Sequence, residues 1–299
     1  MLDRQQQRES ANSNQLEQFM DARPVRVIGI ASGKGGVGKT NTCINLALDL
    51  ANGGQRVVIL DADLGLANVD VLLGLQPTFD LSHVLNQQRT LEEILVEGPG
   101  GVQVVPATSG VRQMMSLTDD QHQALSRNFS AMAGEIDYLL IDMAAGISDS
   151  VIFMASGCDE LLVVASNEPA SITDAYALMK VLHRDEGMDR FHILSNRNET
   201  SQDGLTMYSK LAVACERFLN VSPRYIGGIP EDPMVRRAVE QQRAVVDRYP
   251  GSPAANAFHK LGDAVRRWPE HQETHKSPFF QRLLRADNEA CTPQGDQSH

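Results

Sequence analysis

Cysteine is scarce in this sequence, and its few copies are isolated. The 299 residues include four cysteines, Cys43, Cys158, Cys215 and Cys291, and none of them forms a CxxC pair. A disulfide framework, a structural zinc site or a carried iron–sulfur cluster would need paired or clustered thiols. The spacing argues against all three and favours a protein of the reducing cytoplasm.

Long apolar runs and a secretion signal are missing as well. The sequence contains no run of about 18 apolar residues, the length that a membrane-spanning helix needs. Residues 1–23 are polar and do not resemble a signal peptide. We therefore predict a chain that does not span a membrane.

Positive charge is in deficit. The sequence has 27 lysine and arginine residues against 38 aspartate and glutamate residues, which gives a formal net charge of −11. Nucleic acid repels such a chain at long range. Direct binding to nucleic acid is therefore not expected.

Composition divides the chain into three regions. Residues 1–23 are rich in Gln, Asn, Arg and Glu, which predicts a flexible amino-terminal tail. Residues 24–268 carry the apolar runs of one folded domain, without a visible internal repeat. Residues 269–299 are polar again, and they are predicted to form a linker followed by a short amphipathic segment.

Within the central region, short runs rich in Val, Ile and Leu alternate with longer helical patterns. Continuous apolar runs are typical of strands buried on both faces, and the alternation predicts parallel βαβ units. We expect strands at Val25–Ala31, Val57–Asp61, Val102–Pro106, Tyr138–Asp142, Glu160–Ala165, His192–Ser195 and Tyr225–Ile229. We expect helices at Gly38–Gly53, Thr118–Gly134, Ser148–Ser156, Thr173–Glu186, Leu205–Leu219, Pro233–Gln242 and Pro253–Trp268. The predicted fold class is α/β: a doubly wound, mostly parallel sheet with helices on both faces and its ligand at the carboxyl ends of the strands.

A phosphate-binding loop follows the first predicted strand. The segment 33–40 reads GKGGVGKT and matches GxxxxGK[ST], and it opens a predicted helix, as this motif requires. Its main-chain N–H groups and the positive end of the helix suit phosphate oxygens. We predict ATP and Mg²⁺ as ligands, with Lys39 on the β- and γ-phosphates and the Thr40 hydroxyl on Mg²⁺. The predicted nucleotide-binding residues of the loop are Gly33, Gly35, Gly36, Val37, Gly38, Lys39, Thr40 and Asn41.

Three aspartates lie at the ends of two predicted strands, where a ligand crevice is expected. We assign support of the Mg²⁺ water shell to Asp61 and orientation of the attacking water to Asp63. Asp142 ends the apolar run YLLID, the Walker B pattern, and is also assigned to Mg²⁺ through water. The alternatives are two aspartates that cap a loop and a plain strand terminus.

Five segments carry a resemblance to a known family. Over about Arg26 to Trp268 the sequence resembles the MinD/ParA class of P-loop ATPases, in GKGGVGKTN, LDADLGLANVDVLLGL, LLIDMAAGISDS, NEPASITDAYALMK and IPEDPMVRRAV. The lysine at the second loop position, Lys34, marks the deviant Walker A form of that class. The second and fourth segments look most like the FlhG/FleN branch, whose members regulate the number and placement of bacterial flagella.

The resemblance implies a homodimer in the ATP state, with slow, regulatory hydrolysis of ATP. In this class Lys34 reaches the partner copy's nucleotide, where a second cation would offset charge on the transferred phosphoryl group. Family analogy also assigns adenine contacts to Asn196 and to Pro230, Glu231 and Asp232, for which ordinary turns are the alternative. The implied partners are the flagellar GTPase FlhF and a transcription activator of the FleQ type.

The last segment has a one-sided apolar pattern. Phe279, Phe280, Leu283 and Leu284 are spaced for one face of a short helix, with polar and basic residues opposite. Such a face suits a membrane interface or docking on the protein's own surface. The family implies the first, as an ATP-dependent peripheral association of a cytoplasmic protein with the inner membrane or the cell pole.

Two related functions stay open at this point. A MinD-like protein that selects the cell-division site shares the fold and the chemistry. A ParA-like protein that partitions DNA would need a basic face, against which the net charge of −11 argues. The stretch Asn14–Met20 departs from the DQAxxLR-like helix with which family members stimulate the partner GTPase.

Overall fold

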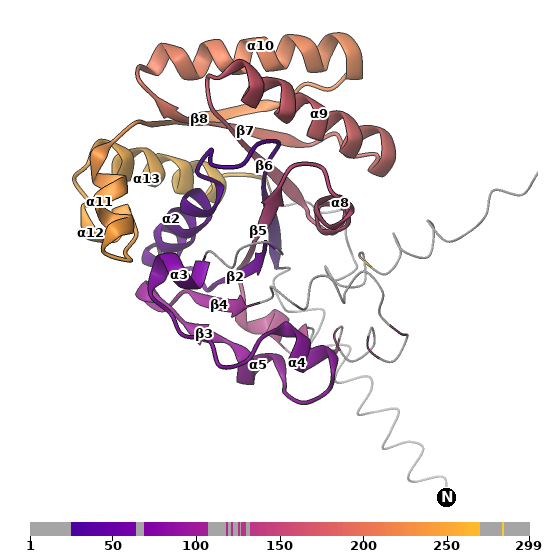
Figure 1. Ribbon diagram of the computed structural model, residues 1–299, viewed down its shortest axis with the longest axis vertical. Helices are drawn as coiled ribbons and strands as arrows, with labels where there is room; N and C mark the ends of the chain where they lie inside the picture. Colours follow the sequence, from indigo (N-terminus) through magenta and orange to yellow (C-terminus); the bar gives the residue numbers. More distant parts are fainter. Residues whose placement is uncertain are drawn as a thin grey trace, which may run out of the picture.

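One sheet of eight strands runs through the part of the chain that the computed structural model describes, namely residues 25–63, 69–106, 118, 121, 125, 127–129, 132–269 and 283. The strand order is β3-β4-β2-β5-β1-β6-β7-β8 (Figure 1). The strands are β1 (Arg26–Ser32), β2 (Val57–Ala62), β3 (Val96–Glu97), β4 (Gln103–Pro106), β5 (Tyr138–Ala145), β6 (Glu160–Ala165), β7 (Phe191–Asn198) and β8 (Arg224–Pro230). Neighbouring strands pair in parallel except β3 and β4, which are antiparallel. The predicted α/β class is confirmed.

Helices cover both faces of the sheet. The helices packed into one buried cluster are α4 (Leu81–Leu85), α5 (Leu91–Ile94), α8 (Asp149–Ser156), α9 (Pro169–Glu186) and α10 (Ser201–Leu219). Those packed into the other cluster are α2 (Lys39–Asn52), α3 (Val69–Leu73), α11 (Pro233–Glu240), α12 (Val245–Arg248) and α13 (Pro253–Arg266). Two short 3₁₀ helices, Pro99–Gly101 and Ala133–Glu135, complete the described elements.

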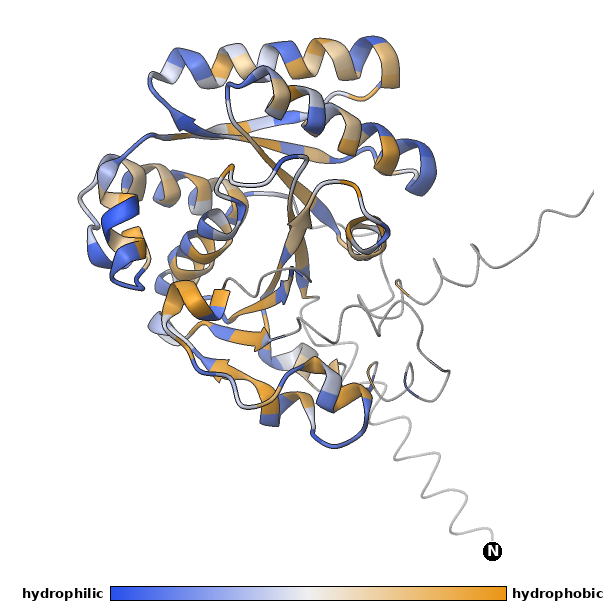
Figure 2. Cartoon of the chain, viewed as in Figure 1, coloured by the Kyte–Doolittle hydropathy of each residue, from blue (hydrophilic) through white to orange (hydrophobic). Residues whose placement is uncertain are grey.

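The central strands are buried on both faces, as their apolar runs predict. In β1, Val27 and Ala31 belong to one cluster, whereas Ile28 and Ile30 belong to the other. Hydrophobic colours accordingly concentrate in the strands and along the inner sides of the helices (Figure 2). Because side chains alternate along a strand, a sheet that is buried on both faces needs no polar alternation.

Helix starts account for the main differences from the predicted bounds. Helix α9 begins at Pro169 rather than at Thr173, since proline suits the first helical position. Helix α10 begins at Ser201 because Thr200 and Asp203 form a capping box, each side chain accepting from the other residue's main-chain N–H. The sequence did not predict β3, α3, α4, α5 or α12, which are too short for periodicity to reveal. The helix predicted at 118–134 falls largely outside the described residues.

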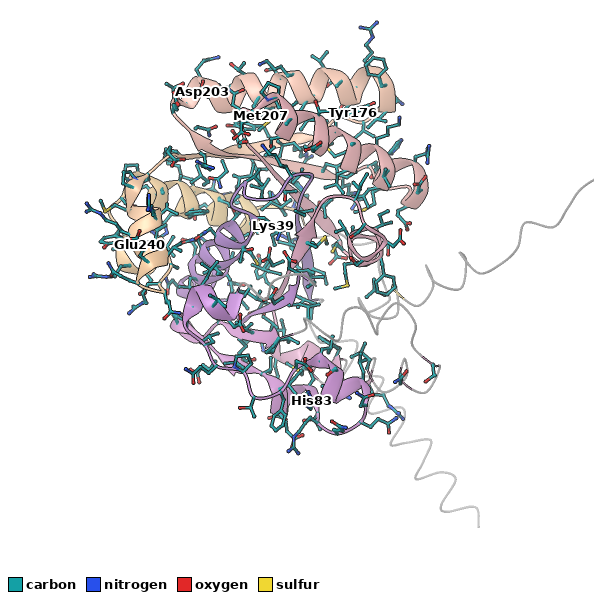
Figure 3. The ribbon with its side chains drawn as sticks, viewed as in Figure 1. Lys39, His83, Tyr176, Asp203, Met207 and Glu240 are labelled. Carbon is teal, nitrogen blue, oxygen red and sulfur yellow. The ribbon has the colours of Figure 1, made fainter. Side chains whose placement is uncertain are left out.

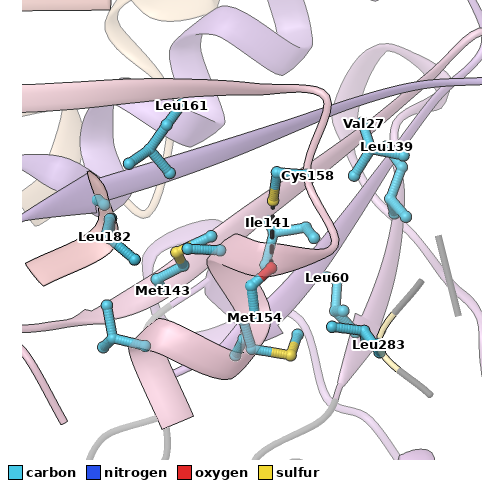
Figure 4. Packing of buried hydrophobic residues seen from close by; sticks show 14 of the residues in the cluster. Val27, Leu60, Leu139, Ile141, Met143, Met154, Cys158, Leu161, Leu182 and Leu283 are labelled. Atoms are coloured by element: carbon cyan, nitrogen blue, oxygen red, sulfur yellow. Dashed lines mark hydrogen bonds between the residues drawn. The ribbon is translucent and has the colours of Figure 1, made fainter. Parts of the chain in front are cut away.

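One residue of the carboxyl-terminal segment is described. Leu283 is 1% exposed and belongs to the buried cluster that also contains Leu60 and Leu139 (Figure 4). Leu283 therefore packs against the domain. Phe279, Phe280 and Leu284 lie outside the described residues. Within the described ranges, no helix has both the length and the apolar character to cross a membrane.

A buried polar pair lies near the amino-terminal ends of β6 and β7. His192 Nε2 is 2.7 Å from Glu160 Oε2, and both side chains are 5% exposed. The Trp268 ring stacks on the imidazole, with 3.8 Å between the ring centroids. The Arg26 guanidinium donates to the main-chain oxygens of Val265 and Trp268 at 3.2 and 3.1 Å. These contacts fasten the end of α13 to the amino-terminal ends of β1, β6 and β7. The predicted ligand site lies at the opposite, carboxyl ends of the strands.

Replacing His192 with Ala is expected to lower the free energy of unfolding by about 3–5 kcal/mol, because it takes the imidazole away from a buried carboxyl group. Urea denaturation at pH 7 measures the change. The matched control is Arg236→Ala, which breaks an exposed pair with Glu240 at 3.1 Å and should cost at most about 1 kcal/mol. A loss for His192→Ala as small as that of the control would contradict a stabilising role.

Candidate nucleotide-binding site

The phosphate-binding loop connects β1 to α2 and packs on α9. A Cβ atom on Gly33 would lie 2.1 Å from the carbonyl carbon of Asp174, so only glycine fits between the loop and that helix. Gly36 and Gly38 have φ angles of 78° and 91°, the left-handed region that favours glycine. A Cβ atom on Gly35 would meet nothing within 4 Å. The loop is therefore anchored on one side and open on the other, where a ligand can approach.

Replacing Gly33 with Ala is expected to destabilise the protein by about 2 kcal/mol or more, because main-chain atoms of α9 cannot move aside cheaply. Thermal unfolding without nucleotide should then shift downward by about 4 °C or more. Gly35→Ala is the control, since the new methyl group meets open space. Equal melting temperatures for the two variants would refute the close packing on α9.

Asn196 braces the loop from the end of β7. Its Nδ2 donates to the Val37 carbonyl oxygen at 2.8 Å, and its Oδ1 accepts from the Arg197 N–H at 2.9 Å. A Cβ atom on Gly38 would lie 2.3 Å from this amide nitrogen, so the glycine also makes room for Asn196. The family resemblance assigns Asn196 to adenine, which stays a prediction, and the hydrogen bond to Val37 was not predicted.

Lys39 and Asp142 form a buried ion pair beneath the loop. Lys39 Nζ lies 2.8 Å from Asp142 Oδ1, and the side chains are 7% and 0% exposed. Figure 3 labels Lys39 at the start of α2, next to the sheet. Parallel pairing of β1 with β5 sets Asp142 beside Ile30, three residues before the loop begins. The predicted loop lysine and Walker B aspartate are thus brought together, and they contact each other.

The second oxygen of Asp142 is buried and has no hydrogen-bond partner among the described residues. Burial raises the pKa of this carboxyl group, and the Lys39 ammonium, followed by the Thr40 hydroxyl, opposes that shift. A buried carboxylate oxygen without a partner suits a metal-bound water, which would donate a hydrogen bond to it. The structure therefore provides a group that fits the predicted Mg²⁺ water shell.

Asp61 and Asp142 occupy paired positions on β2 and β5. Asp61 is buried and accepts from the main-chain N–H groups of Asp63 at 3.4 Å and Val69 at 3.1 Å. Asp61 therefore holds both ends of the segment that follows β2. An aspartate that caps a loop in this way was the alternative to a role at the metal. Asp63 is half-buried, and its charge contributes to the raised pKa of Asp142. The metal and water roles of Asp61 and Asp63 stay predictions.

Thr40 and Asn41 occupy the first turn of α2, and both are half-buried. The Asn41 carbonyl oxygen accepts from the Asn45 side-chain amide at 2.7 Å, and Asn45 Oδ1 accepts from the Val246 N–H at 3.1 Å. This turn is therefore tied to α12 through a buried asparagine. The assignments of Thr40 to Mg²⁺ and of Asn41 to nucleotide stay predictions.

Lys34 makes an ion pair on its own chain. Its Nζ lies 2.6 Å from Glu168 Oε2, with exposed fractions of 39% and 55%. The hydrogen bond from Lys34 lowers the pKa of Glu168. Glu168 stands immediately before Pro169, the first residue of α9. No sequence pattern indicates this partner, because the two residues are 134 positions apart.

The residues after β8 have partners in the structure. Glu231 Oε2 lies 3.0 Å from Arg197 Nε, and the Glu231 N–H donates to the Asn198 carbonyl oxygen at 2.9 Å. Asp232 caps α11 through the Met234 N–H at 2.9 Å and also accepts from the Ala254 N–H at 3.0 Å. Pro230 pairs with Asn198 in the β7–β8 register. These residues lie at the strand ends beside Asn196, and their adenine contacts stay predictions.

The described cysteines offer no metal site. Cys43, Cys158 and Cys215 are buried and free of disulfide bonds. Burial, followed by the nearby Asp142, raises the pKa of the Cys43 thiol. In the described ranges, no group of three or more His, Cys, Asp and Glu side chains is placed to hold a metal.

A glycine loop between a central strand and a helix, with its lysine paired to an aspartate of the neighbouring strand, defines a P-loop nucleotide-binding protein. The model of the ParA family, described as a NUBPL iron-transfer P-loop NTPase, matches residues 24–266. The chain belongs to this family.

Similar proteins refine this placement. The antiactivator FleN of Pseudomonas aeruginosa is 47% identical over 271 residues, which cover 90% of this chain and 97% of FleN. The flagellum site-determining protein YlxH of Helicobacter pylori is 30% identical, with 73% of this chain and 74% of YlxH covered. The septum site-determining protein MinD of Pyrococcus horikoshii, solved with Mg-ADP, superposes with a TM-score of 0.66 at 25% identity, covering 81% of this chain and 96% of that one. The resemblance to MinD/ParA ATPases and to their FlhG/FleN branch is confirmed.

Proposed function

We propose that this protein is an ATP-dependent molecular switch that hydrolyses ATP and limits the number or sets the placement of flagella. The observation that carries the proposal is the 47% identity to the antiactivator FleN, which extends over 97% of that protein. The name of YlxH, a flagellum site-determining protein, supports the same cellular role. The Lys39–Asp142 pair beneath the loop supports the ATPase chemistry.

Nucleotide binding would rearrange the buried pair. The loop N–H groups and Lys39 bind the phosphates, and Lys39 gives up its contact with Asp142 at least in part. Mg²⁺, when bound, offsets the phosphate charge, with Thr40 as its protein ligand and with Asp61 and Asp142 acting through water. Asp63 orients the attacking water. The solved complex of MinD with Mg-ADP supports an adenine nucleotide and Mg²⁺ as the groups that bind here.

ATP binding would also bring two copies together. Lys34 lies on the exposed part of the loop, so it can leave the surface of its own chain and reach the nucleotide of a second copy. A cation contributed in this way stabilises charge in the transition state. The resulting dimer presents a surface to FlhF-type or FleQ-type partners, and slow hydrolysis resets it.

The carboxyl-terminal segment would link the nucleotide state to the membrane. The buried Leu283 supports a docked state of this segment on the domain. Release of the segment in the ATP-bound dimer would present two apolar faces to a bilayer, and two weak contacts together bind more tightly than one. Deleting residues 278–299 is expected to abolish ATP-dependent flotation with anionic liposomes. Unchanged flotation would reject the membrane role.

A deletion strain tests the cellular role. We expect excess flagella or misplaced flagella, counted by electron microscopy, and rescue by the wild-type gene but not by the Lys39→Ala variant. Minicells with normal flagella would favour the MinD-like function. Chromosome or plasmid loss, together with a salt-sensitive DNA shift in ATP, would favour the ParA-like function.

A further inference from the structure

Four charged side chains of alternating sign form a row at the mouth of the loop. Lys34 lies 2.6 Å from Glu168, and Arg197 lies 3.0 Å from Glu231. Arg197 follows Asn196, which donates to Val37 in the same loop as Lys34, and the Arg197 charge also lowers the pKa of Glu168. The row thus runs from the loop, past the start of α9, to the ends of β7 and β8. Glu168 pairs with Lys34 and also feels the charge of Arg197.

The backbone at both ends of this row is held in place. Gly33 packs against α9 so closely that it fixes the loop beside the start of that helix. Arg197 has a φ of 59°, a left-handed conformation that non-glycine residues seldom adopt and that often marks functional sites. Its N–H donates to Asn196, which itself braces the loop. Lys34 and Arg197 therefore stand on two segments whose backbone is held in place.

We propose that Glu168 is a latch that holds Lys34 on its own chain, and that Arg197 takes over Glu168 when Lys34 leaves for the nucleotide of a second copy. This inference rests on the proposed dimer. Glu168 is a positioning residue, since it acts through Lys34. The carboxylate also lies at the start of α9, where the helix dipole favours negative charge. Its release from Lys34 is therefore less costly than the release of an isolated carboxylate.

Opening one latch should change the dimer dissociation constant modestly, and opening two symmetric latches should change it more. An exposed ion pair changes an equilibrium by about 1.5- to 5-fold. A twofold dimer opens two latches, so the dimer dissociation constant should change by about 2- to 25-fold. Because both partners are partly exposed, salt should weaken the effect.

The first test measures the contact between Lys34 and Glu168 in protein that has not dimerised. In nucleotide-free protein, trace labelling with acetic anhydride followed by mass spectrometry measures the reactivity of Lys34 relative to the exposed Lys180 and Lys210. Glu168→Gln is expected to raise Lys34 labelling by about 1.5- to 5-fold, since the ion pair no longer covers the amine. Glu168→Asp should restore part of the protection. Unchanged labelling in Glu168→Gln would overturn the latch, whatever the protein does with ATP.

The second test measures how the contact between Lys34 and Glu168 affects the dimer dissociation constant. Sedimentation with a non-hydrolysable ATP analogue should show a dimer about 2- to 25-fold tighter for Glu168→Gln, with the ratio to wild type falling toward one in high salt. Arg197→Gln should act in the opposite direction, and the double variant should behave like Glu168→Gln. Glu240→Gln, which removes the same charge from a remote exposed pair, is the control.

The outcomes separate the two proposals. Higher Lys34 labelling with a tighter dimer supports the latch. Higher labelling with no dimer in either protein would refute the dimer switch, and with it the role of the latch in association. If Glu240→Gln tightened the dimer as much as Glu168→Gln, the change would come from net charge alone. That result would overturn the specific role of Glu168.

Discussion

Replacing Lys39 with Ala is expected to abolish measurable ATP binding, with a loss of affinity of at least about 100-fold. Lys39 starts α2 beneath the loop and is almost fully buried, so its ammonium is held in place by the helix. Loss of one member of a buried, hydrogen-bonded charge pair costs about 2–5 kcal/mol of binding free energy. Isothermal titration calorimetry with Mg-ATP measures the change.

The same substitution also affects the nucleotide-free protein, because Lys39 is the partner of the buried Asp142. Burial raises the pKa of that carboxyl group, and the loss of the lysine should raise it further. A carboxyl group whose pKa is raised by folding stabilises the fold below its unfolded pKa, and this stabilisation is lost as the pH rises through the folded pKa. The variant should therefore lose stability toward neutral pH more steeply than the wild type.

A double variant separates binding from stability. Lys39→Ala combined with Asp142→Asn removes the buried charge together with its partner, and it should recover most of the stability but none of the affinity for ATP. Tight Mg-ATP binding by a folded Lys39→Ala protein would refute the assignment of the loop.

The sequence was most informative where chemistry and structure are local. The loop pattern, the strand before it and the helix after it are contiguous, so their association is encoded within about 25 residues. Strand-end aspartates could be assigned because parallel strands bring their carboxyl ends to one edge. Asp61 and Asp142 accordingly share a register position.

Contacts between distant segments were not predictable in this way. Asn196 braces Val37 across 159 positions, and Glu168 holds Lys34 across 134. Both depend on the register and on helix packing, which periodicity does not reveal. The direct Lys39–Asp142 pair was also missed, because each residue was assigned to the ligand rather than to the other. The short elements β3, α3, α4, α5 and α12 fall below the length at which a pattern can be recognised.

Replacing Asp63 with Ala is expected to trap an ATP-bound dimer, with turnover at least about 100-fold slower and ATP affinity nearly unchanged. A group that orients or activates the attacking water contributes about 10²–10⁴-fold to a rate, whereas it adds little to binding of the ground state. The contact from residue 63 to Asp61 survives the change, because it is made by the main-chain N–H. Loss of the Asp63 charge should lower the pKa of Asp142, which favours the ionised carboxylate for the Mg²⁺ water shell.

Phosphate release and sedimentation in ATP measure the two parts of this expectation. The matched control is Asp70→Ala, which removes a carboxylate from the nearby helix α3 and should change turnover by less than about twofold. A slow, dimeric Asp63→Ala protein beside an active control would assign the water to Asp63. Wild-type turnover by Asp63→Ala would assign that role to another group, and Asp61, which pairs with Asp142 in the β2–β5 register, would be the next residue to test.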